Sequence, residues 1–89
     1  MYAYGKGAPQ DYREAVEWYR LAAEQGNPDG QNNLGFMYDN GQGVPRDYVQ
    51  AHMWYNLAGV GGDAQSVKNR DLVAKKMTPA QIAEAQRLA

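Results

Sequence analysis

Residues 37–62 read MYDNGQGVPRDYVQAHMWYNLAGVGG, and residues 1–26 read MYAYGKGAPQDYREAVEWYRLAAEQG. The two stretches are 36 residues apart and agree at 13 of their 26 positions, including both tryptophans of the chain. A period of about 20 to 50 residues is typical of stacked-repeat proteins, in which each unit covers the apolar face of its neighbour. The sequence therefore predicts a stacked-repeat architecture.

Within one period the local signals are helical. The first helix is expected to begin at Asp11, because aspartate caps helices and small or apolar side chains follow at three- and four-residue spacing. Gly26, two residues before a proline, predicts the end of this helix. We expect further helices over residues 29–39 and 47–60, separated by a glycine-rich loop at 40–43. The repeating unit is thus an αα-hairpin, and the chain is predicted to be an all-α solenoid.

The central unit has the pattern Leu34-Gly35-x-x-Tyr38-x-x-Gly41-x-Gly43-Val44-x-x-Asp47-x-x-x-Ala51-x-x-Trp54-Tyr55-x-x-Ala58. This pattern resembles one complete unit of the Sel-one-like repeat (SLR) family, a relative of the tetratricopeptide repeats. The resemblance implies stacked helical hairpins and a role in protein interaction, since similar proteins act as adaptors and scaffolds, often in bacteria. Gly30 and Gly59 stand where the family has alanine, and we expect them to loosen the helices that contain them.

The sequence changes character after residue 62. It contains no further aromatic residue, and the Leu-Gly-x-x-Tyr pattern is lost. A helix is still expected over residues 63–76, with Val67, Leu72 (or Asp71) and Val73 near its apolar side. Thr78 followed by Pro79 predicts the start of another helix. Because solenoids close their stack with more polar terminal units, this tail is interpreted as a pair of C-terminal capping helices.

We interpret the chain as a single SLR domain with a partial repeat at 1–26, a complete repeat at 27–62 and a C-terminal cap at 63–89. Met1 falls in the register of Met37, inside the first helix of a repeat. The helix that begins at Asp11 is therefore expected to lack its hairpin partner. Its apolar side, which includes Trp18 and Tyr19, is expected to be partly exposed.

Composition excludes several classes of function. Nine Lys and Arg residues against ten Asp and Glu residues give a net charge of −1, which disfavours a nucleic-acid-binding protein. The chain has no cysteine and a single histidine, so neither a metal site nor a cofactor is expected. No stretch resembles a membrane span or a signal peptide, so no membrane insertion is expected, and a soluble protein of either the cytoplasm or the periplasm fits the sequence without a choice between them.

Catalytic chemistry finds little support in the sequence. His52 falls at a partly apolar position, and Ser66 lies at a polar helix start with no base to mark it as a nucleophile. The loop Gly41-x-Gly43 lacks the third glycine of a dinucleotide-binding fingerprint. Trp18 and Trp54 recur at one register and therefore predict helix packing rather than ligand stacking. The chain is thus expected not to be an enzyme, and a hydrolase is the least favoured of the functions considered.

The helix over residues 29–39 supplies the candidate binding surface. In helical repeats the first helix of each hairpin tends to line the concave side, which suits a peptide or a partner helix. If Leu34 and Tyr38 face the core, the outward positions are Asp29, Asn32, Asn33, Phe36 and Asn40. Asparagine amides can bond an extended backbone, and Phe36 can act as an apolar anchor. The alternative is a self-assembling unit, a homo-oligomer in which residues 1–26 dock on a second copy.

Overall fold

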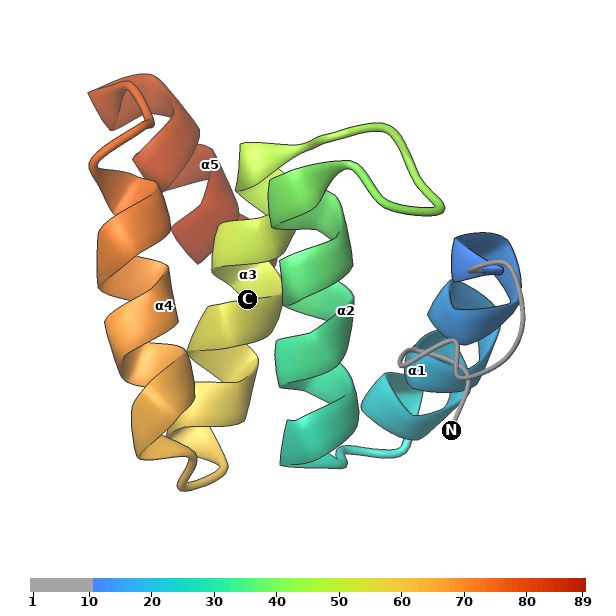
Figure 1. Cartoon of the computed structure of the whole chain (residues 1–89). Coiled ribbons are helices and arrows are strands. Elements are labelled where there is room, and N and C mark those ends of the chain that lie inside the picture. Colours follow the sequence, from blue (N-terminus) through green and yellow to red (C-terminus); the bar gives the residue numbers. More distant parts are fainter. Residues whose placement is uncertain (1–10) are drawn as a thin grey trace.

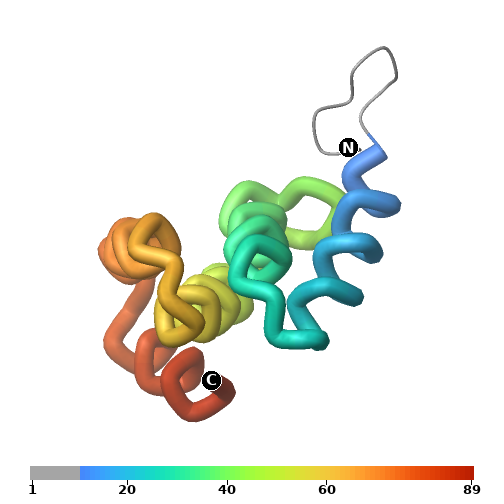
Figure 2. The backbone as a smooth tube through the Cα atoms, turned by 90° about the horizontal axis from the view of Figure 1, so that it is seen from below, coloured from blue at the N-terminus to red at the C-terminus, as the bar shows by residue number. Residues whose placement is uncertain are grey.

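The computed structural model describes residues 11–89, and this part of the chain consists of helices joined by short turns. Its five helices are α1 (Tyr12–Glu24), α2 (Pro28–Asn40), α3 (Tyr48–Val60), α4 (Ala64–Ala74) and α5 (Pro79–Leu88). Helix α2 packs between α1 and α3, and α3 also contacts α4 and α5 (Figure 1). Seen from below, α2 and α4 lie on one side of α3 and α5 lies on the other (Figure 2). The predicted all-α helical-repeat fold is confirmed.

The equivalent helices α1 and α3 begin in the same way. Asp11 and Asp47 are their N-caps, and each carboxylate accepts a hydrogen bond of 3.1 Å from a backbone N–H three residues later. These bonds satisfy donors that a helix start otherwise leaves without partners. The loop before α3 turns at Gly41 and Gly43, whose φ angles of +66° and +77° lie in the left-handed region. Both the caps and the loop agree with the sequence prediction.

The helices α4 and α5 are joined by a tight turn. We expected the first of them to continue to residue 76, but it ends at Ala74. The N–H groups of Lys75 and Lys76 bond to carbonyls only three residues back, which closes the helix with a narrower turn. Helix α5 then begins with the predicted capping box, in which Thr78 and Gln81 each accept a bond from the other's backbone N–H.

The core consists of two apolar clusters that meet at α2. The first lies between α1 and α2 and contains Ala15, Val16, Ala23, Leu34 and Met37. The second contains Ala51 and Tyr55 of α3 and Val73 of α4. Tyr38 packs against both clusters, so the apolar interior continues from one hairpin to the next. Trp54 packs against the first cluster as expected, whereas Trp18 is 55% exposed.

Three helical glycines mark places where neighbouring helices approach closely. A Cβ atom at Gly35 would lie 2.8 Å from Cδ1 of Tyr55, so α2 and α3 approach each other closely at this position. Gly30 and Gly59, which we expect to loosen their own helices, also lie where neighbouring helices approach closely. A Cβ at Gly30 would lie 2.6 Å from the Cβ of Ala22, and one at Gly59 would meet Val67 at 2.8 Å. Both glycines therefore allow tighter packing between helices.

The predicted apolar side of α4 is confirmed at Val73 but not at Leu72. Ser66 and Val73 are fully buried, whereas Leu72 is 56% exposed. Residues seven apart lie on the same face of an α-helix, while Leu72 is turned by about 100° from Val73. Val73 is therefore buried as predicted, whereas the placement of Leu72 on the apolar side is wrong.

Candidate interaction surface

The five residues predicted to form a binding surface all belong to α2, but they differ in exposure and in their hydrogen-bond partners. Leu34 and Met37 turn inward and are 0% and 3% exposed, so the opposite side of α2 is available for other contacts. Asp29, Phe36 and Asn40 are exposed on that side, whereas Asn32 and Asn33 are half-buried. Phe36 is 47% exposed and is the only apolar side chain among the five.

Asn32 joins α2 to α4. Its Oδ1 accepts hydrogen bonds from Oγ of Ser66, at 2.9 Å, and from Nδ2 of Asn69, at 3.0 Å. Ser66 is fully buried, and its hydroxyl also lies 2.6 Å from Oδ2 of Asp63. The expectation that Asn32 points outward is thus corrected, because α4 supplies partners for its side chain that a single repeat does not contain.

Asn40 is engaged within its own helix. Its Nδ2 donates a bond of 2.9 Å to the backbone carbonyl of Phe36, one turn earlier. The side chains of Asp29 and Asn33 make no hydrogen bond within residues 11–89, so their polar groups can bond to a partner. Of the predicted surface, Asp29, Asn33 and Phe36 remain available for binding.

A second link joins α2 to α4 near their C-terminal ends. Nζ of Lys76, just beyond α4, lies 3.0 Å from Oδ1 of Asp39 and 5.2 Å from the ring centroid of Tyr48. The other carboxylate oxygen of Asp39 accepts a bond of 3.3 Å from the hydroxyl of Tyr55. Burial, together with this carboxylate, raises the pKa of Tyr55 above its usual range, so the phenol stays protonated and can donate. The two links join α2 and α4 directly, although both helices pack mainly against α3, which lies between them in Figure 1 (see also Figure 2).

Leu72 is a residue of this surface that the sequence interpretation missed. It is separated from Phe36 by 36 residues, so the two occupy the same position in successive repeat helices. The 36-residue register was therefore a usable signal, since Phe36 was already predicted to point outward. The apolar character of Leu72 suggested burial instead.

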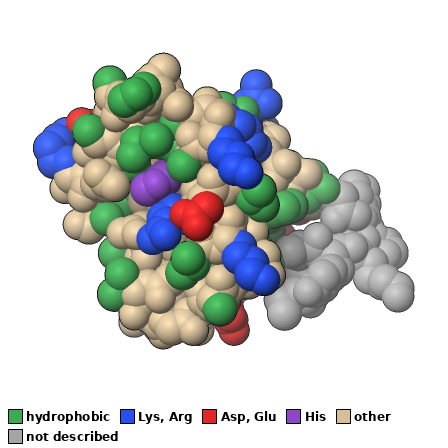
Figure 3. All heavy atoms as spheres, turned by 90° about the vertical axis from the view of Figure 1, so that its left-hand side faces the viewer, with side chains coloured by type: hydrophobic (Ala, Val, Ile, Leu, Met, Phe, Trp, Pro, Cys, Tyr) green, Lys and Arg blue, Asp and Glu red, His purple; other side chains and the backbone are tan. Residues whose placement is uncertain are grey.

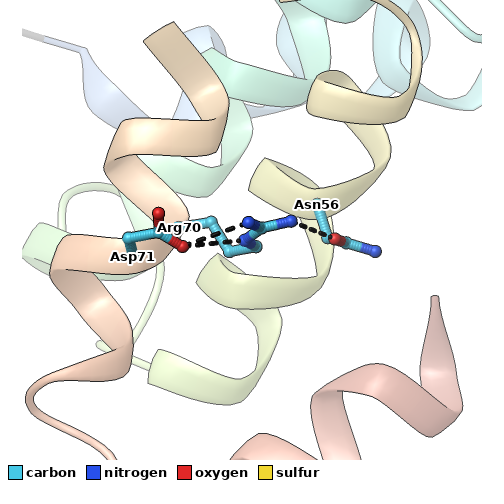
Figure 4. A network of polar contacts seen from close by, with 3 residues as sticks. All are labelled: Asn56, Arg70 and Asp71. Carbon is cyan, nitrogen blue, oxygen red and sulfur yellow. Dashed lines mark hydrogen bonds and ion pairs between the residues drawn. The ribbon is translucent and has the colours of Figure 1, made fainter. Parts of the chain in front are cut away.

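A polar cluster lies between α3 and α4. Nη1 of Arg70 donates a bond of 2.9 Å to Oδ1 of Asn56, and its Nε and Nη2 donate to Oδ1 of Asp71 (Figure 4). His52 of α3 is only 4% exposed, and its Nδ1 is buried with no hydrogen-bond partner within residues 11–89. Burial lowers the pKa of His52, and the positive charge of Arg70 lowers it further, against a weaker opposing effect of Asp71. The imidazole is therefore neutral at pH 7.

The described residues offer few groups for catalysis or metal binding. No group of three or more His, Asp or Glu side chains between residues 11 and 89 could hold a metal ion. Ser66 is buried and bonded to Asn32 and Asp63, so its hydroxyl does not face solvent as a nucleophile. None of the helices α1 to α5 is long and apolar enough to cross a membrane.

The exposed side of α1 carries two large apolar side chains. Trp18 is 55% exposed and Leu21 is 54% exposed, in agreement with the expected partial exposure of this helix. Tyr19 is half-buried and packs against the first core cluster. Residues 1–10 of the predicted partial repeat at 1–26 lie outside the described residues.

Helices α1 and α3 are equivalent, and α2 and a loop that turns at two glycines lie between them in the chain. This arrangement defines a helical-repeat protein of the αα-hairpin class. The chain belongs to the Sel1 repeat family, whose repeat matches residues 1–27 and 28–63. The resemblance to SLR proteins is thereby confirmed. A comparison with curated proteins gives no match.

Two solved structures have the same fold. The first is a protective antigen of uropathogenic Escherichia coli strains that displays an SLR fold; it is 40% identical over 97% of this chain, with a TM-score of 0.90. The second is a Sel1 repeat protein from Oxalobacter formigenes, which is 38% identical over 82% of this chain, with a TM-score of 0.77. The chain spans only 19% and 21% of the lengths of these two proteins.

Proposed function

We propose that this chain is a non-catalytic protein-interaction module that binds a peptide or a partner helix on the exposed side of α2. The observation that carries the proposal is the 47% exposure of Phe36 on a helix whose other large apolar side chains are buried or half-buried. An aromatic side chain is a frequent anchor of protein interfaces. Asn33 and Asp29 flank it with polar groups that have no partner within residues 11–89.

Affinity capture with the full chain tests this function. Proteins retained by the wild-type chain are identified by mass spectrometry and compared with those retained by Phe36→Ala and by Val60→Ala. Val60 is 81% exposed at the end of α3 and serves as a matched apolar control. We expect a specific set of proteins to be lost with Phe36→Ala and kept with Val60→Ala, at unchanged melting temperature. If Phe36→Ala retains every protein that the wild-type chain retains, the α2 surface is not the binding site.

A second candidate function is self-association through residues 1–26. It is supported by the exposure of Trp18 and Leu21 on one helix, because symmetric dimers commonly bury such apolar surface. Light scattering over a range of concentrations tests it. A concentration-dependent rise in mass that Leu21→Ser reduces is expected if α1 docks on a second copy, and a monomer at high micromolar concentration contradicts it.

We also propose that residues 63–89 cap the complete repeat at 27–62. Val73 of α4 and Ala85 of α5 are fully buried, which supports a covering role for both helices. Removal of α5 is expected to expose apolar surface of α3, which binding of a fluorescent hydrophobic dye would detect. Unchanged dye binding after this truncation would contradict a capping role for α5.

A further inference from the structure

The exposed apolar side chains of α2 and α4 lie at the same level of the two helices. Phe36 is 47% exposed and Leu72 is 56% exposed. Both lie between the two links that join these helices, one through Asn32 and the other through Asp39 and Lys76. Phe36 and Leu72 are thus equivalent exposed positions on two linked helices, and this pair is the apolar surface considered for binding.

Positive charge flanks this apolar surface on one side only. Lys68 lies one turn before Leu72 and Lys75 lies one turn after it, and both are exposed. Neither lysine forms an ion pair within residues 11–89, whereas the neighbouring Asp71 is paired with Arg70 at 3.1 Å. Seen from the α4 side, basic and hydrophobic side chains lie next to each other on the molecular surface (Figure 3).

Helix α2 has the opposite character. It contains Asp29 and Asp39 and no basic residue. Asp39 is paired with Lys76, but the exposed carboxylate of Asp29 has no partner within residues 11–89 and disfavours a nucleic acid or an anionic membrane on this side. A peptide can instead place its acidic groups beside α4 and its neutral groups beside α2, so charge complementarity favours a peptide with acidic residues at one end.

We propose that Phe36 and Leu72 together bind a short acidic peptide segment, with one apolar side chain of the peptide on each helix and its carboxylates on Lys68 and Lys75. This inference rests on the proposed function and specifies its partner. Leu72 contributes a second anchor, and the two lysines select for negative charge. Asn33 lies beside Phe36 and is placed to bond to the peptide backbone.

Selection from a random library of short peptides displayed on phage tests this inference with the full chain as bait. We expect the enriched peptides to carry two apolar residues and an excess of Asp and Glu. In binding assays with these peptides, Phe36→Ala and Leu72→Ala should each weaken affinity by about tenfold, the size typical of an interface anchor. Val60→Ala is the control and should leave the affinity unchanged. Reversal of the lysine charges in a Lys68→Glu, Lys75→Glu double variant should shift the selected peptides from acidic to basic.

The outcomes separate this inference from the proposed function. Enriched peptides that depend on Phe36 but not on Leu72 or the lysines would overturn the inference and leave α2 as the binding surface. Peptides whose charge does not respond to the lysine reversal would overturn it as well. A selection that enriches no peptide over the bare support would contradict both the inference and the proposed function. Equal melting temperatures of all variants exclude loss of fold as the cause.

Discussion

At the scale of single residues, the most informative comparison is between the two repeat interfaces. Val16 of α1 and His52 of α3 occupy the same register, and both are 4% exposed. Leu34 of α2 and Arg70 of α4 are equivalent in the same way. The first interface therefore contains two aliphatic side chains where the second contains a neutral imidazole and a guanidinium. Protonation of His52 would place two positive charges at the second interface.

Because His52 stands where the first interface has Val16, we predict that the stability of the chain decreases in mild acid. Because the pKa of His52 is lowered in the folded chain, the unfolded chain binds a proton first as the pH falls through about 6.5. The contribution of His52 to the free energy of unfolding is therefore constant above about pH 6.5 and decreases as the pH falls from there to the lowered pKa. Urea unfolding of the wild-type chain and of His52→Val between pH 5 and pH 8 should show a smaller pH dependence for the variant.

The charges around His52 support this assignment. Those that act on its imidazole are Arg70 and Asp71, both on α4. On α5, Glu84 and Arg87 pair with each other, and on α2 the carboxylate of Asp39 is bonded to Tyr55 and Lys76. If the stabilities of His52→Val and of the wild-type chain decrease equally as the pH is lowered, groups other than His52 are responsible for the acid sensitivity.

Gly35 provides a second prediction at this scale. Alanine is favoured over glycine by about 1 kcal/mol in an exposed helix, but here its Cβ would overlap the buried ring of Tyr55. Overpacking of this kind costs about 1–3 kcal/mol. Gly35→Ala should therefore lower the midpoint of urea unfolding, and the same change in a Tyr55→Leu background should be less destabilising. A stabilising effect of Gly35→Ala in the wild-type background would contradict the close approach.

At the scale of helices, the link between α2 and α4 can be tested by substituting two neighbouring asparagines in turn. Asn32→Ala removes an acceptor that serves Ser66 and Asn69, and we expect a loss of about 1 kcal/mol of stability. Asn33→Ala removes a side chain with no bond within residues 11–89 and gains helix propensity, so it should be neutral or slightly stabilising. Equal effects of the two changes on chemical unfolding would argue against the link.

The helices themselves could be predicted from the sequence because their signals are local. The N-caps Asp11, Asp47 and Thr78 each bond to a backbone N–H three residues later. The turn at Gly41 depends only on the positive φ angle that glycine itself can adopt. The candidate surface was predicted less completely. The partners of Asn32 lie 34 and 37 residues later in the chain, so its role depends on how α4 packs. Leu72 was misplaced because its hydrophobicity suggested burial, although its register with Phe36 indicated exposure.

At the scale of the whole molecule, packing is uneven along the stack. Helices α2 and α3 each pack between neighbours, and they contain the fully buried Leu34 and Ala51. Helix α5 packs mainly on α3 and contributes one fully buried side chain, Ala85. Repeat arrays open from the ends, where fewer contacts are lost. Hydrogen exchange should therefore be slowest in α2 and α3 and fastest in α5, and uniform protection across α2 to α5 would contradict this gradient.

The side-chain links between α2 and α4 have a consequence for how such proteins can diversify. Both helices pack against α3, whereas the side chains of Asn32, Asp39 and Lys76 join α2 to α4 directly. Exchange of these polar side chains for longer or shorter ones would change the spacing between the anchors Phe36 and Leu72 while leaving the interior intact. Specificity can thus evolve by altering a few surface bonds, without a redesign of the packing that makes the fold.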